Sequence, residues 1–259
     1  MGKGNFPLKI INWGCFSPYR NMAIDEALLA SRREDNSIIF RVYGWKPYSV
    51  SIGFFQPVEE INLEYLKEKN IPFVRRPTGG KGVYHANEIT YSIVIPSSHE
   101  IYKLSTVESF KVISRIFLNF LTRLGLKPQI TKKSGGKHGF CFSSSNYYEI
   151  SIYGKKIVGS AQRRRKEGIL QHGSIPITLE VEEIKRIFYL KDISFFTSLD
   201  RYLPHVKLQW LLDILTSEVK ELFGKDGATY LKEPEEGIID LVNKLEKEKY
   251  STHSWNYRI

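Results

Sequence analysis

The sequence is poor in cysteine, and its two cysteines lie far apart. Cys15 and Cys141 stand in a chain of 259 residues without metal-ligand spacing. This pattern argues against a disulfide framework, in which several closely placed cysteines staple a small core, and against a zinc site. We therefore expect a reducing compartment, a cytoplasmic location and no bound metal.

Long apolar runs are also missing. No stretch of the sequence approaches the roughly 18 apolar residues that a membrane-spanning helix needs. The opening residues MGKGNFPLKIINWG lack an apolar run with a cleavage site, and Phe6 replaces the Ser or Thr of a myristoylation signal. We expect a globular protein that does not use a membrane.

Positive charge is present in excess. The 38 Lys and Arg residues outnumber the 28 Asp and Glu residues, which gives a formal charge of +10. Such a surplus favours an acidic partner, either a nucleic acid or an acidic protein. Because neither a recognition-helix signature nor an RNA-stacking motif is present, we do not expect nucleic acid to be the partner.

The first part of the chain predicts helices mixed with strands. An apolar stripe after Asn21, taken as the N-cap, predicts a helix that ends near Arg33. Two β-branched runs, 37–43 and 49–55, are joined by a Gly-Trp-Lys-Pro turn and predict a hairpin. A short helix from Asn62, an extended segment at 71–76 and a strand at 88–96 that Pro96 ends are expected to follow.

Further along, a long half-buried helix is predicted from Ser105 to Leu124, with Gly125 as its C-cap. A basic loop at 131–139 then precedes three strands, and helices follow near the C-terminus. The strands are expected at 147–153, 156–160 and 168–177, and the helices at 207–223 and 235–248. This pattern predicts the α+β class with a mixed sheet. A soft boundary separates a catalytic core, 1–180, from a helical extension of the same domain, 181–259.

Two glycine-punctuated basic segments carry the functional signal. Residues 75–92 read RRPTGGKGVYHANEITYS, and residues 154–174 read GKKIVGSAQRRRKEGILQHGS. Glycine lets backbone N–H groups approach a ligand closely, and the neighbouring Arg and Lys residues favour an anionic or strongly polar ligand. The two segments together predict one site.

These segments resemble the superfamily of lipoate-protein ligases, lipoyl and octanoyl transferases and biotin-protein ligases. The family carries an RRxTGG-type loop and a later KIxGSA segment with the active-site lysine, which Lys156 matches. Three further landmarks look similar: NMAIDEALL at 21–29, SVSIGFFQ at 49–56 and WNYR at 255–258. The resemblance covers most of the chain. It implies the fold of class II aminoacyl-tRNA synthetases and biotin synthetases, in which helices flank a mixed sheet.

Within the superfamily, two segments favour the cysteine-dependent octanoyltransferases of the Bacillus type. They are HANEITYS at the end of the first motif and GFCFSSSNYYEI at 139–150. The resemblance makes Cys141 the nucleophile, which takes octanoyl from octanoyl-acyl carrier protein as a thioester. The acyl group then passes to a lysine of a lipoyl domain or of the glycine cleavage H protein. Neither ATP nor a metal is implied.

Lys156 is predicted to lower the Cys141 pKa or to stabilise the oxyanion. Its rival is Lys155, which strand alternation sends to the opposite face. We also predict a set of substrate-binding residues in the two motifs: Arg75, Thr78, Gly79, Gly80, His85, Tyr91, Gly159, Ser160, Ala161, His172 and Gly173.

Several roles stay open at this point. His85 and His172 are expected to hold loops in place rather than to shuttle protons. In the run 163–165, only Arg163 and Arg165 are expected to share a face, where they meet either an acidic carrier protein, its phosphopantetheine phosphate or solvent. Tyr91 and Tyr147 are candidates for the wall of an octanoyl tunnel.

Two other enzymes share these motifs. One is an ATP-dependent lipoate-protein ligase, in which Lys156 would contact the phosphate of lipoyl-adenylate and Cys141 would be incidental. Cys141 and the lack of room for a further C-terminal domain argue against it. The other is an amidotransferase that moves octanoyl or lipoyl between two lipoyl domains through a cysteine thioester. The sequence barely separates it from the octanoyltransferase.

Overall fold

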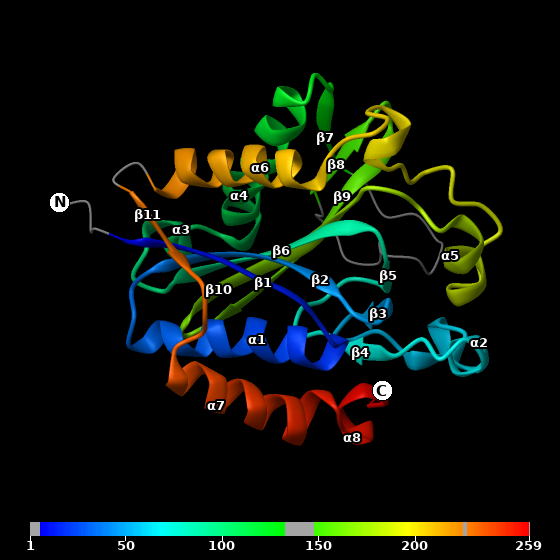
Figure 1. Ribbon diagram of the computed structural model, residues 1–259, viewed down its shortest axis with the longest axis horizontal. Coiled ribbons are helices and arrows are strands. Elements are labelled where there is room, and N and C mark those ends of the chain that lie inside the picture. The colour runs from blue at the N-terminus through cyan, green and yellow to red at the C-terminus, as the bar shows by residue number, and fades with distance from the viewer. Residues whose placement is uncertain (1–5, 133–147, 225–226, 259) are drawn as a thin grey trace.

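The computed structural model describes residues 6–132, 148–224 and 227–258 (Figure 1). Its strands are β1 (Leu8–Phe16), β2 (Ile38–Trp45), β3 (Ser49–Ile52), β4 (Phe73–Arg75), β5 (Val83–His85), β6 (Glu88–Pro96), β7 (Pro128–Lys132), β8 (Tyr148–Ile152), β9 (Lys155–Arg165), β10 (Gly168–Pro176) and β11 (Ala228–Leu231). Its α-helices are α1 (Pro18–Ala30), α2 (Leu63–Glu68), α3 (Glu100–Lys103), α4 (Thr106–Arg123), α5 (Val181–Ile187), α6 (Leu208–Phe223), α7 (Glu236–Leu245) and α8 (His253–Asn256). Short 3-10 turns lie at Ser31–Arg33, Val58–Glu60 and Leu199–Arg201, and a π-helical turn at Glu246–Tyr250.

The described strands form two sheets. The large sheet has the order β11-β1-β2-β6-β10-β9-β8-β7, and the small one has the order β4-β3-β5. β1 runs parallel to β2 and β11. The other neighbours in this sheet, β2 with β6, β6 with β10, β10 with β9, β9 with β8 and β8 with β7, pair antiparallel. The predicted α+β class with a mixed sheet flanked by helices is therefore confirmed.

The predicted hairpin of 37–43 with 49–55 is wrong. β2 pairs with β1 and β6 in the large sheet, whereas β3 pairs with β4 and β5 in the small one. The Gly-Trp-Lys-Pro segment is thus a crossing between two sheets. A turn signal in the sequence does not reveal which partner each strand takes, because pairing depends on distant segments.

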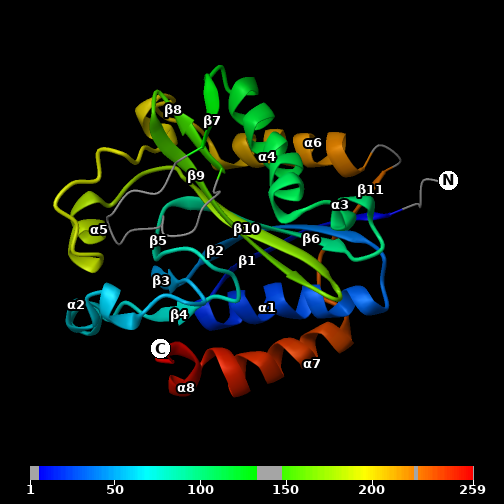
Figure 2. The same cartoon turned by 180° about the vertical axis from the view of Figure 1, so that it is seen from behind.

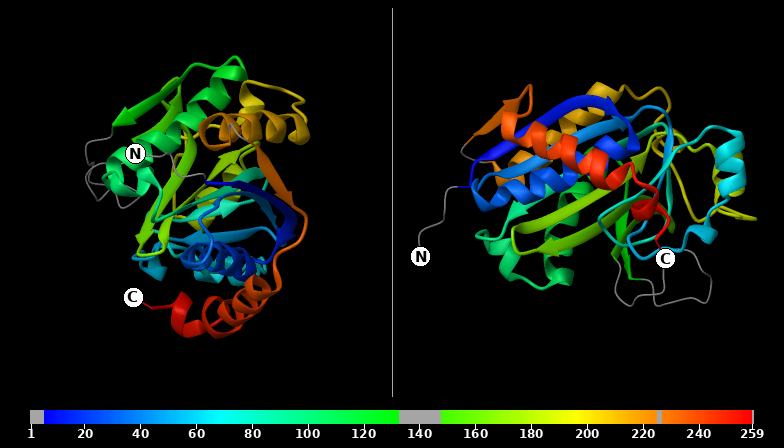
Figure 3. Two further views of the ribbon diagram at one scale, coloured as in Figure 1. Left: turned by 90° about the vertical axis from the view of Figure 1, so that its left-hand side faces the viewer. Right: turned by 90° about the horizontal axis from the view of Figure 1, so that it is seen from below.

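Helices cover both faces of the large sheet (Figures 1 and 2). α4 and α6 pack together on one face, which we call the α4 face. α1 lies on the other, which we call the α1 face, and α7 packs on α1 from outside. The left view of Figure 3, turned by 90° about the vertical axis, shows the sheet between these layers. The small sheet lies beside α2 and α5 at one end of the molecule.

Local signals explain where two of these helices begin and end. α4 starts with a capping box, in which Ser105 accepts from the Glu108 N–H and Glu108 reaches back to Ser105. Gly125 follows it at φ +80°, as a C-terminal glycine should. α1, in contrast, does not start at the predicted Asn21: Ser17 caps it, and Pro18 is its first residue.

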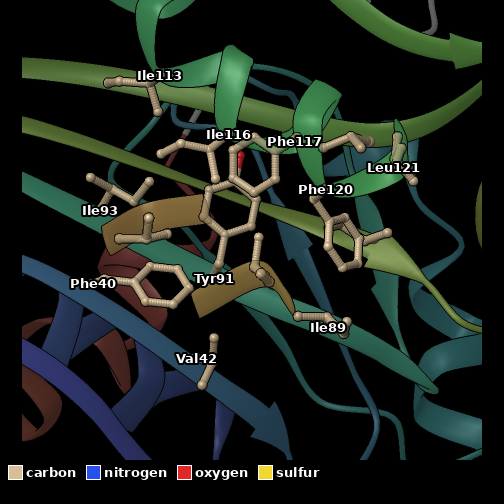
Figure 4. Packing of buried hydrophobic residues seen from close by; sticks show 14 of the residues in the cluster. Phe40, Val42, Ile89, Tyr91, Ile93, Ile113, Ile116, Phe117, Phe120 and Leu121 are labelled. Carbon is tan, nitrogen blue, oxygen red and sulfur yellow. The ribbon is translucent and has the colours of Figure 1, made fainter. Parts of the chain in front are cut away.

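The α4 face holds the larger apolar core (Figure 4). Tyr91 and Ile93 of β6 point toward α4, where the Tyr91 ring lies 4.2 Å from that of Phe117. Phe117 and Phe120 are completely buried. Apolar residues at helical spacing on 106–123 thus meet alternate residues of a strand, which is the packing that their periodicities predict.

The residues after 180 contain a strand as well as helices. β11 joins the large sheet beside β1, α7 packs against α1, and α8 contacts β4. None of the helices in the described residues is long and apolar enough to cross a membrane. Of the basic loop predicted for 131–139, residues 131 and 132 instead end β7, and the rest lies outside the described residues.

Candidate active site

Both sequence motifs border one cavity on the α1 face of the large sheet. The cavity contains about 520 Å³ of empty space, including space open to solvent. It lies among the glycine loop after β4, the ends of β3 and β5, strands β9 and β10, and helix α1. Its lining is Met22, Tyr43, Trp45, Ser51, Arg76, Gly80, Lys81, Val83, His85, Thr90, Lys156, Gly159, Ser160, Ala161, His172, Gly173 and Ser174. A second cavity, with about 840 Å³ of empty space including space open to solvent, adjoins it and shares Lys81, Val83, Lys156, Gly159 and Ser174. The motifs are thus brought together, as predicted.

A β-bulge places Lys156 at the junction of the two cavities. In the pairing of β8 with β9, Ile150 faces Val158 but Ser151 faces Lys156, so Ile157 is the extra residue. In a regular strand, residues three apart point to opposite faces. The extra residue lets Lys156 and Gly159 border the same cavity, while the Lys155 side chain is exposed. Strand alternation therefore separates the two lysines as predicted.

Polar and backbone contacts hold Lys156 in this position. Its ammonium lies 2.8 Å from the Glu149 carboxylate, which is buried on β8. The backbone N–H of Lys156 donates to the Phe195 carbonyl, and the backbone carbonyl of Lys156 accepts from the Thr197 N–H. The segment after α5 thus fixes the backbone of Lys156, and Glu149 fixes its side chain.

At the cavity, two close backbone contacts require glycine. A Cβ on Gly173 would come within 2.1 Å of the Gly159 carbonyl oxygen, so β9 and β10 leave no room for a side chain there. A Cβ on Gly53 would lie 1.8 Å from the Gly80 carbonyl oxygen, and Gly80 itself has φ +89°. The glycines therefore allow backbone to approach backbone at the site.

Both predicted histidines line the cavity, and both ring nitrogens of each have partners. His85 contacts Glu88 through Nδ1 at 2.6 Å and Ser51 through Nε2 at 2.8 Å. His172 contacts Asp25 through Nδ1 at 3.0 Å and the Thr78 hydroxyl through Nε2 at 2.6 Å. His172 therefore connects the glycine loop to α1. This arrangement supports the holding role.

Asp25 is the centre of a buried polar network below the cavity. Its carboxylate accepts from Arg41 at 2.7 Å, from Ser92 at 2.9 Å and from Tyr43 at 3.0 Å. Burial alone would raise the Asp25 pKa, but Arg41 and His172 outweigh it and lower that pKa. Burial lowers the pKa of His172 although Asp25 opposes this shift, so His172 is neutral at pH 7.

Four of the predicted site residues lie outside the cavity lining. Arg75 is completely buried and donates to carbonyls of Gly53, Phe54, Gln56 and Asn256, so it ties the glycine loop to two other motifs. Thr78 lies behind His172, and the Gly79 carbonyl accepts from Arg76. Tyr91 lies in the core of the α4 face, and only its hydroxyl reaches toward the site, 2.6 Å from the Ser160 hydroxyl. Cys141 and Tyr147 are outside the described residues.

Some residues of the cavity lining were not among the predicted site residues. Arg76 lines the cavity, although Arg75 was named instead. Tyr43 and Trp45 also line it, and their signal was available, since alternate residues of one strand share a face. Glu149 gave a weaker signal, a single charge in an apolar strand.

The arginine run divides between the two faces, as predicted. Arg163 donates to the Pro77 carbonyl at 2.6 Å, and Arg165 lies 3.4 Å from Glu26 of α1. Arg164 points the other way and donates to the Leu104 carbonyl. In the described residues, no group of three His, Cys, Asp or Glu side chains has the geometry of a metal site.

Comparison with known proteins decides the family. The Lipoyl protein ligase A/B catalytic domain matches residues 17–220. The chain belongs to this family. It is 34% identical to Octanoyltransferase LipM of Bacillus subtilis (strain 168), over 96% of this chain and 98% of that protein. Octanoyltransferase LipM of Geobacillus kaustophilus (strain HTA426) is 36% identical with the same coverage. The predicted resemblance to the Bacillus-type subgroup is therefore confirmed.

Solved structures support the fold. A putative lipoate protein ligase from T. acidophilum superposes with a TM-score of 0.80, at 23% identity, over 98% of this chain and 100% of that one. A lipoate-protein ligase A bound with ATP gives a TM-score of 0.81 at 24% identity, over 98% of both chains. Identities this low establish a shared fold and do not transfer ATP binding to this chain.

Proposed function

We propose that this chain is an octanoyl-[acyl-carrier-protein]:protein N-octanoyltransferase that works through a thioester on Cys141. Relatives at 34–36% identity over nearly the whole chain are octanoyltransferases, and octanoyl transfer for lipoate biosynthesis is the activity they support. The observation in the site that carries the proposal is the placement of Lys156, the predicted active-site lysine, where two cavities meet.

The reaction takes two acyl transfers. The Cys141 thiolate attacks the thioester carbonyl of the octanoyl carrier, a new C–S bond forms, and the carrier's thiolate leaves and takes up a proton. The neutral amine of an acceptor lysine then attacks the acyl-enzyme, an amide forms, the Cys141 thiolate leaves, and the amine nitrogen releases one proton, which balances the proton taken up by the carrier's thiolate. A thioester already stores the free energy that amide formation uses, so neither ATP nor a metal has a part.

Lys156 supplies positive charge where the oxyanion of each tetrahedral intermediate develops. A donor already fixed in place contributes more than a mobile one, because little reorganisation is needed during the reaction. Glu149 and the backbone contacts to Phe195 and Thr197 give Lys156 that fixed position. Its charge also favours the thiolate form of a nearby cysteine.

The two cavities suit the two parts of the substrates. The first is closed on its inner side by Met22 and Trp45, which are 1% and 5% exposed, so it suits the octanoyl chain. The second is bordered by Leu179, Ile184 and Phe188 near the surface helix α5. Apolar walls there suit the methylene stem of an acceptor lysine, on a lipoyl domain or a glycine cleavage H protein.

The test is mass spectrometry of the intact protein after incubation with octanoyl-acyl carrier protein without ATP. We expect an octanoyl adduct that hydroxylamine removes, present on the native protein and absent from Cys141→Ala. If no adduct forms, and lipoate with ATP modifies a lipoyl domain equally well with either protein, the ligase alternative replaces this proposal. Transfer from an octanoylated H protein but not from the carrier would instead favour the amidotransferase.

A further inference from the structure

Four cations gather beside the C-terminal segment, on the α1 face of the sheet. We call Arg163, Arg165, Lys249 and Arg258 the basic cluster. Glu26 of α1 lies among them, 2.5 Å from Lys249 and 3.4 Å from Arg165. In the described residues no other carboxylate forms an ion pair with any of the four. Within the described residues, the cluster therefore holds three more positive charges than negative ones.

Aromatic rings rather than acids surround two of these cations. The Arg258 guanidinium lies 3.6 Å from the Trp255 ring centre and 4.0 Å from that of Phe54. Arg163 lies 4.4 Å from the same Phe54 ring. Burial lowers the pKa values of Arg163 and Arg258, and the neighbouring arginines lower them further. Stacking on rings holds guanidinium groups in place but does not balance their charge.

Arg258 also has unused hydrogen-bond donors. Its Nε and Nη2 atoms are buried and have no hydrogen-bond partner in the described part of the chain. These two N–H groups form one edge of the guanidinium, the edge that binds two oxygens of a phosphate or carboxylate side by side. A buried donor without a partner is costly, so a bound anion would stabilise this arrangement.

The cluster borders the active-site cavity. Gly159 and Ala161 line the cavity, and Arg163 and Arg165 follow them at every second position of β9, so they continue the same face. Arg163 donates to Pro77 at the start of the glycine loop. From Gly159 to Arg163 the strand spans roughly 13 Å at about 3.3 Å per residue. An extended arm that ends in the cavity can therefore carry its anionic end at the cluster.

We infer that the basic cluster binds a phosphate group, and that its ligand is the phosphodiester of the donor's phosphopantetheine arm. The choice of this ligand rests on the proposed function. The four cations converge around one carboxylate and are partly buried, which suits a single compact anion. The acidic surface of a carrier protein would instead be met by exposed cations spread over a wide area.

The experiment measures binding without any acyl transfer. The full chain is titrated with 4′-phosphopantetheine, with pantetheine and with inorganic phosphate, by calorimetry or by the fluorescence of its tryptophans. We expect 4′-phosphopantetheine to bind about tenfold to a hundredfold more tightly than pantetheine, as a charge-assisted bidentate contact should give. Arg258→Met keeps a long side chain against the Trp255 and Phe54 rings but removes the guanidinium, so it should remove most of the preference for 4′-phosphopantetheine over pantetheine.

Two more variants separate the cluster from general charge and from folding. Arg165→Ala alters a partly exposed side chain and should lower the preference severalfold without disturbing the fold. Lys166→Ala removes the same charge from an exposed side chain of the next turn and should leave the preference unchanged.

Three outcomes would overturn the inference. They are equal binding of 4′-phosphopantetheine and pantetheine by the native protein, equal losses in Lys166→Ala and Arg165→Ala, and inorganic phosphate binding as tightly as 4′-phosphopantetheine, which would indicate an adventitious anion site. Because no acyl group is involved, the phosphate preference stands or falls separately from the octanoyl-enzyme test.

Discussion

The two faces of the large sheet are built from the same strands but differ in chemistry near the site. On β6, Tyr91 points into the apolar core of the α4 face, whereas Thr90 and Ser92 point to the α1 face. On β2, Val42 and Arg41 divide in the same way. Both faces gain stability from apolar burial, and the α1 face adds a buried charge network that holds the site. Alternation along a strand lets one sheet serve both purposes.

The largest expected effect on folding comes from breaking the polar network. Asp25→Ala leaves the fully buried Arg41 without its carboxylate and removes the acceptor of His172. We expect the free energy of unfolding to fall by about 3–5 kcal/mol, as measured by chemical denaturation. Glu235→Ala removes an exposed partner of Lys9 and should cost less than about 1 kcal/mol. Similar losses in the two variants would contradict the role given to the network.

A smaller effect should appear in the pH dependence of stability. Burial lowers the pKa of His172 below its ordinary value, so the unfolded chain takes up a proton on it at a higher pH than the folded chain does. As pH falls through about 6.5, the unfolded state therefore binds more protons and stability decreases, by at most about 1.4 kcal/mol per pH unit. Asp25 does not interfere, because its lowered pKa acts only below about pH 4.

His172→Gln should flatten this slope. Denaturation curves of the native protein and the variant between pH 7 and pH 5 measure the difference. His99→Gln is the comparison variant. Burial also lowers the pKa of His99, which lies outside the site, so this variant shows how much of the slope comes from a second buried histidine. A slope that His172→Gln leaves unchanged would show that His172 is not the buried neutral group described above.

The smallest effect tests the Tyr91 hydroxyl, which links the core of the α4 face to Ser160 of the cavity lining. Tyr91→Phe keeps the ring against Phe117 and removes the hydrogen bond to Ser160. We expect a loss of about 1 kcal/mol in the free energy of unfolding. Burial raises the pKa of Tyr91, so its hydroxyl stays protonated and the loss should not change between pH 6 and pH 9. A loss that grows with pH would contradict this assignment.

Local signals in the sequence predicted the elements that depend on local structure. The α4 helix, the β6 strand and the Asn62 N-cap of α2 all lie where capping residues and periodicity place them. The hairpin of β2 with β3 failed because strand partners are set by distant segments. Asn21 was taken for a cap because the amide of Asn often caps helices, but tertiary contacts bury it: its Nδ2 donates to the Phe16 and Gly44 carbonyls and its Oδ1 accepts from Arg41.

The site was predictable where motif and alternation agree. Lys156 and glycines from both motifs, Gly80, Gly159 and Gly173, border the cavity, and Arg163 and Arg165 share a face. Arg75 and Arg76 show the limit: adjacent residues of one type take opposite roles, and only the fold decides which of them is fully buried.

The most direct test of this account compares the two adjacent lysines of β9. The bulge at Ile157 makes Lys156 part of the site and leaves Lys155 in solvent. The measurement is the single-turnover rate of the proposed acylation step, with octanoyl-acyl carrier protein as the donor, for Lys156→Met and Lys155→Met. We predict that Lys156→Met slows acylation by about a hundredfold to a thousandfold, as loss of one oxyanion donor does, and that Lys155→Met keeps the native rate. Equal rates in the two variants would contradict the site described for this protein.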